Sequence, residues 1–138
     1  MSTSVEKSTF SFVKYLITDA KINVSDKEIS KKINFSFTPS GIIDKENKRI
    51  ELKLQTEVSD KNKSFKIKLC AIGLFKYEGS IEDTMQFFCI NGPAILFPYI
   101  RAYLSSLSAL SGIPLILLPT INMTGLAETL KSNIKITE

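Results

Sequence analysis

The stretch PAILFPYIRAYLSSLSALSGIPLILLPTINM, which runs from Pro93 to Met123, decides the fold of this chain. It contains one charged residue, Arg101, although 23% of the whole sequence is charged. Pro93 suits the first position of a helix, and Asn91 is in place to cap it. Gly112 is typical of the residue that follows a helix. The stretch therefore predicts a helix of about five turns from Pro93 to the residues before Gly112.

The two sides of this expected helix differ in side-chain size. One stripe is large and apolar, as in a helix packed on a core: Leu96, Ile100, Tyr103, Leu107 and Leu110. The other side lacks the lysine and glutamate of an ordinary surface helix and carries small residues: Ala102, Ser105, Ser106 and Ala109. Because small side chains allow another backbone to approach closely, we expect a second protomer to cover this side. A solvent-exposed, serine-rich face is the alternative.

The first two-thirds of the chain alternates between apolar and polar residues, which is typical of half-buried strands. Four runs show the pattern: FSFVKYLITDAKINV (10–24), KINFSF (32–37), RIELKLQTEV (49–58) and FKIKLCAIGLFKY (65–77). The turn SDKNKS (59–64) joins the last two runs into an antiparallel hairpin. A sheet with one apolar face needs a cover. The sequence therefore predicts an α+β fold, in which the long helix packs on a sheet built from these strand runs.

After the helix comes IPLILLP (113–119), an unusually apolar connecting loop. Loops normally run over the wet surface, so this one is either packed under something or meant to meet an apolar ligand. The segment NMTGLAETLKSN (122–133) predicts a short second helix with Met123, Leu126 and Leu130 on its apolar side. We expect a single domain over 1–138, with disordered ends at 1–8 and 134–138. A membrane span is not favoured, because a bilayer needs roughly 20 consecutive apolar residues and Arg101 and several prolines interrupt this run.

Composition excludes several classes of chemistry. The chain has no histidine, which removes the commonest general base and the commonest metal ligand. The two cysteines, Cys70 and Cys89, lack metal-ligand spacing, and we expect both to be reduced and buried in a cytoplasmic protein. The net charge is +4, but lysines alternate with acids, so nucleic-acid binding is a weak interpretation. We therefore expect no enzymatic activity, no metal and no cofactor.

The string PAILFPYIR, Pro93 to Arg101, resembles the signature that opens the long helix in the SecB export-chaperone family. The run at 10–24 is similar to the first strand of that family, and GLF (73–75) to its last strand. The pattern P…NM, at Pro119, Asn122 and Met123, resembles the start of its second helix. The resemblance implies a four-stranded antiparallel sheet packed by a long helix, with a connecting loop and a short second helix. It also implies edge-strand dimers that join through the long helices into a homotetramer.

The resemblance implies an ATP-independent holdase that binds non-native polypeptides, such as unfolded preproteins, in apolar grooves. Carried onto this chain, the client contacts are Ile33, Phe35, Phe37, Leu115, Leu117, Met123 and Leu126. The oligomer contact is the small-residue side of the helix, at Ala102, Ser105, Ser106 and Ala109. SecB-like chaperones also serve toxin–antitoxin systems, where the client is a labile antitoxin, so both branches stay open.

One departure concerns the export motor SecA, which binds an acidic sheet surface in export members of the family. This chain is basic, Lys14 and Lys21 flank Asp19, and Asn23 stands where a second acid is expected. Docking to SecA is therefore the less favoured partnership. Two other functions remain as alternatives: a small hydrophobic-ligand-binding protein, and a structural oligomerisation protein with no client-holding activity.

Overall fold

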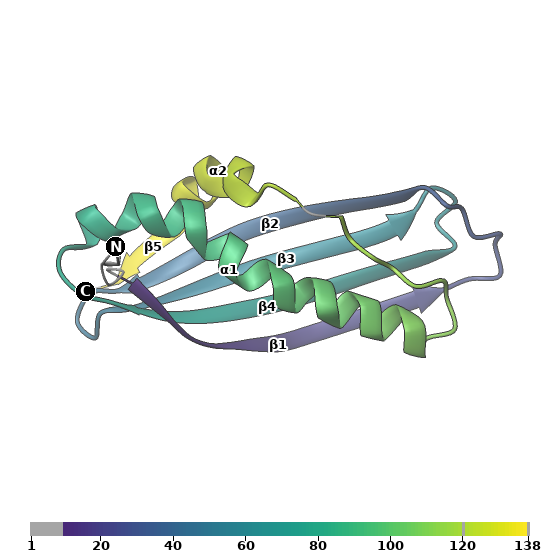
Figure 1. Ribbon diagram of the computed structural model, residues 1–138, viewed down its shortest axis with the longest axis horizontal. Coiled ribbons are helices and arrows are strands. Elements are labelled where there is room, and N and C mark those ends of the chain that lie inside the picture. Colours follow the sequence, from purple (N-terminus) through teal and green to yellow (C-terminus); the bar gives the residue numbers. More distant parts are fainter. Residues whose placement is uncertain (1–9, 120, 138) are drawn as a thin grey trace, which may run out of the picture.

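The computed structural model describes residues 10–119 and 121–137 of the chain. Four long strands come first, and the helical part follows (Figure 1). The elements are β1 (Phe10–Val24), β2 (Ile33–Asp44), β3 (Arg49–Asp60), β4 (Phe65–Tyr77), α1 (Ile81–Leu110), the 3₁₀ turn η1 (Met123–Leu126), α2 (Ala127–Ser132) and β5 (Ile134–Thr137). Helix α1 lies across one face of the sheet, with α2 beside its first half.

The sheet has five strands in the order β1-β4-β3-β2-β5, and all neighbours are antiparallel except β2 and β5. The expected sheet of four antiparallel strands is therefore corrected to a mixed sheet of five. Strand β5 pairs in parallel with Gly41–Asp44, so the expectation of a disordered end was wrong for residues 134–137. The Asn133 side chain donates a hydrogen bond to the Pro39 carbonyl at 3.1 Å, just before β5 begins. Residues 1–8 and 138 lie outside the described residues.

The hairpin predicted over 49–77 is confirmed, because β3 and β4 pair antiparallel with Val58 opposite Ile67 and Leu54 opposite Ala71. Both strands point most of their apolar residues toward α1, where these side chains are almost completely buried. The apolar face of the sheet is thus covered by the long helix, as expected. The other face of the sheet carries mostly polar residues, with a few exposed or half-buried apolar side chains such as Leu16, Ile42 and Ile72.

Helix α1 has 30 residues and begins at Ile81, so the expected start at Pro93 was wrong. Ser80 caps it, since its side chain accepts a hydrogen bond from the Asp83 N–H at 3.3 Å, and the acids of the first turn favour the positive end of the helix dipole. Pro93 and Pro98 lie inside the helix. Proline removes a backbone donor and bends a helix, and α1 changes direction along the sheet (Figure 1). The expected end is confirmed, because α1 stops at Leu110 and Gly112 has φ +77°.

The buried stripe of α1 is rotated from the predicted one. Its core residues include Leu96, Phe97, Ile100, Leu104 and Ser108. Of the predicted stripe, Tyr103 and Leu107 are only half-buried and Leu110 is 88% exposed. The longer helix explains the difference, since its axis is set by packing along the whole sheet and its last turn projects beyond that packing.

A buried carboxylate fixes the end of β3. The side chain of Asp60, which is fully buried, accepts hydrogen bonds from the backbone of Ser30 at 2.9 Å and Ser64 at 2.7 Å. It also accepts the Ser64 hydroxyl at 2.5 Å and the Phe65 N–H at 3.3 Å. Burial alone raises the pKa of Asp60, but these hydrogen bonds outweigh it and lower the pKa to about 2. The charged carboxylate therefore ties the β1–β2 connection to the β3–β4 turn.

We expect Asp60→Asn to lower the free energy of unfolding at neutral pH, because the amide offers fewer acceptors to the same donors. The carboxylate has a lower pKa in the folded state than the ordinary value of 3.8, so its contribution is present above 3.8 and is lost as the pH falls toward about 2. Urea unfolding at several pH values should thus show the gap between the two proteins closing over that window. A gap independent of pH would contradict this role for Asp60.

Candidate functional site

The connecting loop between α1 and η1 has two different sides. Ile113, Ile116 and Leu118 are buried, whereas Leu115 is 56% exposed and Leu117 is 64% exposed. This alternation is that of an extended segment with one face on a core. One side of the loop is therefore packed, as the first expectation had it, while the other side presents leucines to solvent.

Two serines of α1 hold this loop in place. The Ile116 N–H donates to the Ser108 hydroxyl at 2.9 Å, and the Ser105 hydroxyl donates to the Ile116 carbonyl at 2.9 Å. The Ser108 hydroxyl in turn donates to the Ser105 carbonyl at 3.0 Å. The buried backbone of Ile116 is thus satisfied at both its polar groups. Ser105 and Ser108 contact the loop of their own chain, a role that the sequence analysis did not assign to them.

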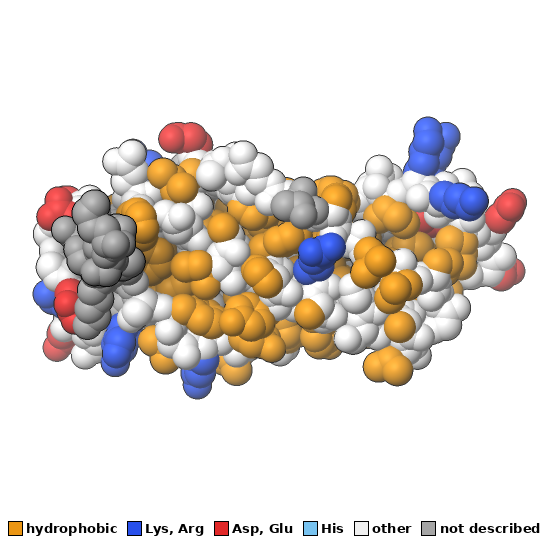
Figure 2. Space-filling model, viewed as in Figure 1, with side chains coloured by type: hydrophobic (Ala, Val, Ile, Leu, Met, Phe, Trp, Pro, Cys, Tyr) orange, Lys and Arg blue, Asp and Glu red, His pale blue; other side chains and the backbone are white. Residues whose placement is uncertain are grey.

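A hollow of about 440 Å³ lies between this loop and α1. Arg101 supplies the charge at its wall, and most of the other side chains are apolar or small. The lining residues are Phe97, Pro98, Arg101, Ala102, Ser105, Leu117 and Ile121. Figure 2 shows hydrophobic surface gathered along the middle of this face of the molecule. Phe97 and Ile121 were missed by the sequence analysis, although both lie within its apolar stretch.

Aromatic rings connect β2 to this hollow. Phe35 is 39% exposed, and its ring centroid lies 6.0 Å from that of Phe37. Phe37 packs edge-to-face on Phe97, with the ring centroids 5.9 Å apart. Because Phe97 lines the hollow, the aromatic row leads from the exposed edge of β2 to the wall formed by the loop. We use the name apolar groove for this hollow together with the residues that flank it, Phe35 and Phe37 on β2 and Leu115 on the loop.

The remaining residues predicted to contact clients differ in exposure. Ile33, Phe37 and Leu126 are half-buried. Met123 is only 3% exposed and belongs to the core beneath η1. The structure thus places Phe35, Leu115 and Leu117 at the surface and the other four deeper. Of the residues predicted to form an oligomer contact, Ala102, Ser106 and Ala109 are exposed, and Ser105 is half-buried against the loop.

A second hollow, of about 740 Å³, lies between the first turns of α1 and α2. Its lining includes Met85, Cys89, Ile90, Ala127 and Lys131, and the sequence analysis did not find it because it treated residues 81–92 as lying before the helix. Burial raises the pKa of the Cys89 thiol, so this thiol is a poor nucleophile at neutral pH. Cys70 and Cys89 are both buried and unpaired with one another, as predicted.

A family profile described as "Preprotein translocase subunit SecB" matches residues 19–132, which cover the end of β1, strands β2 to β4, α1, the connecting loop and α2. The chain belongs to the SecB family. The match includes the apolar groove and the serines that hold its wall. Within the described residues, no helix combines the length and hydrophobicity needed to cross a membrane.

This SecB-family chain is similar in sequence to one protein and in structure to another. It is 47% identical over 49 residues to an uncharacterized protein of Methanocaldococcus jannaschii, MJ0357, a match that spans 36% of this chain and 32% of that protein. The chain therefore aligns with about a third of the length of this curated relative. Its fold is similar to that of the SecB-like chaperone Rv1957 of Mycobacterium tuberculosis, with a TM-score of 0.72 and 15% identity. That likeness covers 82% of this chain and 88% of Rv1957, which was solved with a ChAD peptide from the HigA1 antitoxin.

Proposed function

We propose that this SecB-family chain is an ATP-independent holdase, which binds non-native polypeptides along the apolar groove and prevents their aggregation. The observation that carries the proposal is the pair of exposed leucines, Leu115 and Leu117, on a loop that two serines hold against α1. An exposed apolar surface of this kind is uncommon on a soluble protein without a binding role. Family membership and the antitoxin peptide bound to Rv1957 support the same function.

The binding would follow from the hydrophobic effect and needs no chemical step. An extended client segment would lose water against Phe35, Leu115 and Leu117, at about 25 cal/mol for each Å² of apolar surface buried. The effect is non-directional, so many client sequences would be accepted. The unpaired cysteines favour a reducing compartment, and we place this activity in the cytoplasm.

The client class divides the proposal into two branches. A labile antitoxin is the favoured client, because the similar chaperone Rv1957 was solved with an antitoxin peptide. Unfolded preproteins on their way to export are the second client class, and the basic character of the chain makes SecA the less favoured partner. Co-expression with a candidate antitoxin, followed by measurement of the antitoxin half-life, distinguishes the two branches.

The holdase function is tested by light scattering during thermal aggregation of an unrelated model protein. We expect the chain to suppress aggregation in proportion to its concentration, equally with and without ATP. Titration with an apolar dye should also give a fluorescence increase in the folded state, because the groove is accessible. A chain that neither binds the dye nor suppresses aggregation would contradict the proposal and would favour a purely structural role.

We propose further that copies of the chain associate through the exposed small residues of α1, into a dimer or a tetramer. Ala109→Glu would place a charge in that contact, where it loses water without gaining a partner. We expect light scattering to report smaller particles for this variant while its circular dichroism spectrum is unchanged. Ala109 makes a better test than Ser105, since Ser105 also bonds the loop. An unchanged particle mass would show that this side of α1 is not an interface.

A further inference from the structure

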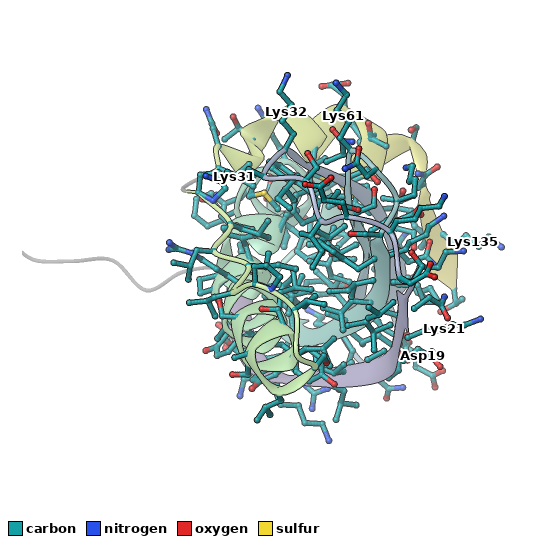
Figure 3. The ribbon with its side chains drawn as sticks, turned by 90° about the vertical axis from the view of Figure 1, so that its right-hand side faces the viewer. Asp19, Lys21, Lys31, Lys32, Lys61 and Lys135 are labelled. Carbon is teal, nitrogen blue, oxygen red and sulfur yellow. The ribbon has the colours of Figure 1, made fainter. Side chains whose placement is uncertain are left out.

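The face of the sheet that points away from α1, which we call the open face, carries an excess of positive charge. These charges lie on the other side of the sheet from the apolar groove. Cross-strand pairing places its residues on one side. It presents six exposed lysines: Lys14, Lys21, Lys53, Lys68, Lys76 and Lys135. Figure 3 shows Lys21 and Lys135 projecting from the sheet on the side opposite the helices. Positive charge therefore dominates the solvent-facing layer of the open face.

The carboxylates of the open face balance these lysines only in part. Asp19 is exposed near Lys21, whereas Glu51 and Glu57 are half-buried. Glu57 is already paired with Lys66 at 2.8 Å. Lys21 lies directly opposite Lys68 in the pairing of β1 with β4. Like charges in this position are destabilising, and a bound anion would relieve the repulsion. The open face thus has an unbalanced positive charge at a defined place on the sheet.

Two neighbouring hollows lie among these charged residues on the open face. One, of about 480 Å³, is lined by three lysines, Lys21, Lys53 and Lys68, by two carboxylates, Asp19 and Glu57, and by hydroxyl groups of β2. The other, of about 530 Å³, is lined by Ile42, Ile72, Lys53 and Lys135, among others. Ile42 is 44% exposed. Lys53 lines both hollows, so the hollow that holds the two isoleucines and the hollow in which lysines outnumber carboxylates meet at one residue.

We propose that the open face docks an acidic polypeptide segment that carries an apolar anchor residue. The anchor occupies the hollow at Ile42 and Ile72, and the carboxylates of the segment face Lys53, Lys21 and Lys68. Protein interfaces commonly combine an apolar centre with a charged rim in this way. The surface is separate from the apolar groove and goes beyond the proposed holdase function, since it lies on the opposite side of the sheet.

Nucleic acid fits this surface less well than an acidic polypeptide. Base stacking requires aromatic side chains, and no described residue on the open face is aromatic. Asp19, Glu51 and Glu57 also interrupt the lysines, which disfavours a continuous run of phosphates. A polypeptide can place its carboxylates at intervals and put an apolar side chain between them, as the two hollows require.

The test uses a fluorescein-labelled synthetic peptide in which glutamates flank a single leucine, with binding followed by fluorescence anisotropy. We expect Lys21→Glu with Lys68→Glu to weaken binding at least tenfold, and Lys21→Gln with Lys68→Gln to weaken it less. The matched control is Lys31→Glu with Lys32→Glu, which makes the same charge change on the β1–β2 connection (Figure 3) and should leave the affinity nearly unchanged. Affinity of the unmodified protein should fall as salt rises, because exposed charges are screened.

The outcomes separate this proposal from its rivals. Equal weakening by the control pair would mean that only the net charge matters, and the proposal would be wrong. Equally tight binding of an oligonucleotide of the same charge, or of a peptide with the leucine replaced by glycine, would also overturn it. If the charge reversals unfold the protein, the proposal is tested instead by Lys21→Gln with Lys68→Gln and by the salt dependence of the affinity. The variant Leu115→Ser with Leu117→Ser should bind the acidic peptide normally, so loss of the groove and loss of the open face are distinguishable.

Discussion

Leu115→Ser combined with Leu117→Ser is expected to weaken the binding of an unfolded client about tenfold, which corresponds to about 1.4 kcal/mol. Both side chains are more than half exposed, so the folded protein does not depend on them for its core. The melting temperature should therefore stay within a few degrees of the unmodified protein, and the oligomer should persist. Anisotropy of a labelled apolar peptide without acidic residues measures the affinity, and calorimetry measures the melting temperature.

A matched control for this experiment is Ile42→Ser, which removes an exposed apolar side chain of similar size from the opposite side of the sheet. Its affinity for the apolar peptide should be unchanged. If the loop variant unfolds, or if it binds the peptide as tightly as before, the loop is not a wall of the binding groove. Equal weakening by Ile42→Ser would instead indicate that clients bind exposed apolar residues without regard to their place.

Ile116→Ala is expected to cost about 2–5 kcal/mol of folding stability, as is usual when a buried aliphatic side chain is truncated in a core. Ile116 is 4% exposed and lies between the two exposed leucines. Its backbone is held by Ser105 and Ser108, so the loop has little freedom to collapse into the space left by the truncation. Urea unfolding of the variant measures the loss directly.

The comparison variant is Leu117→Ala, one residue further along the same loop. It deletes a side chain of the same size, but one that is 64% exposed, so its cost in unfolding free energy should be far smaller. Similar losses for the two variants would contradict the alternation of buried and exposed residues along the loop. The pair therefore tests the geometry of the groove wall without any client present.

The strands could be predicted because their alternation is long and regular. Residues 49–58 and 65–77 alternate regularly, and the observed pairing puts their regularly spaced apolar side chains on one face of the sheet. The end of α1 was equally clear, since Gly112 supplies the positive φ that follows a helix. The four residues of β5 were too few to show an alternation of apolar and polar side chains. They form a strand because they pair with the edge of β2, which is far away in the sequence.

The start of α1 was missed although the sequence contains its signal. Ser80 followed by Asp83 is typical of a capped helix start, but Pro93 was interpreted as the first residue of the helix. Pro93 and Pro98 both lie inside α1. Their tolerance within the helix depends on packing against a twisted sheet, which is a tertiary effect. The small-residue side of α1 was likewise open to two interpretations, because side-chain size indicates a close approach but not which backbone approaches. Part of that side meets the connecting loop of the same chain.

The hydrogen bonds of Ser105 and Ser108 with the backbone of Ile116 have a consequence for the entropy of binding. A flexible loop that closes over a client must lose backbone freedom, at about 1–2 kcal/mol for each residue fixed. Here the hydrogen bonds to Ile116 order the loop before any client arrives, so folding has already met that cost. Only the client has to become ordered. Clients that are already extended should therefore bind more tightly than equally apolar clients that collapse, and the protein would select for unfoldedness as well as for hydrophobicity.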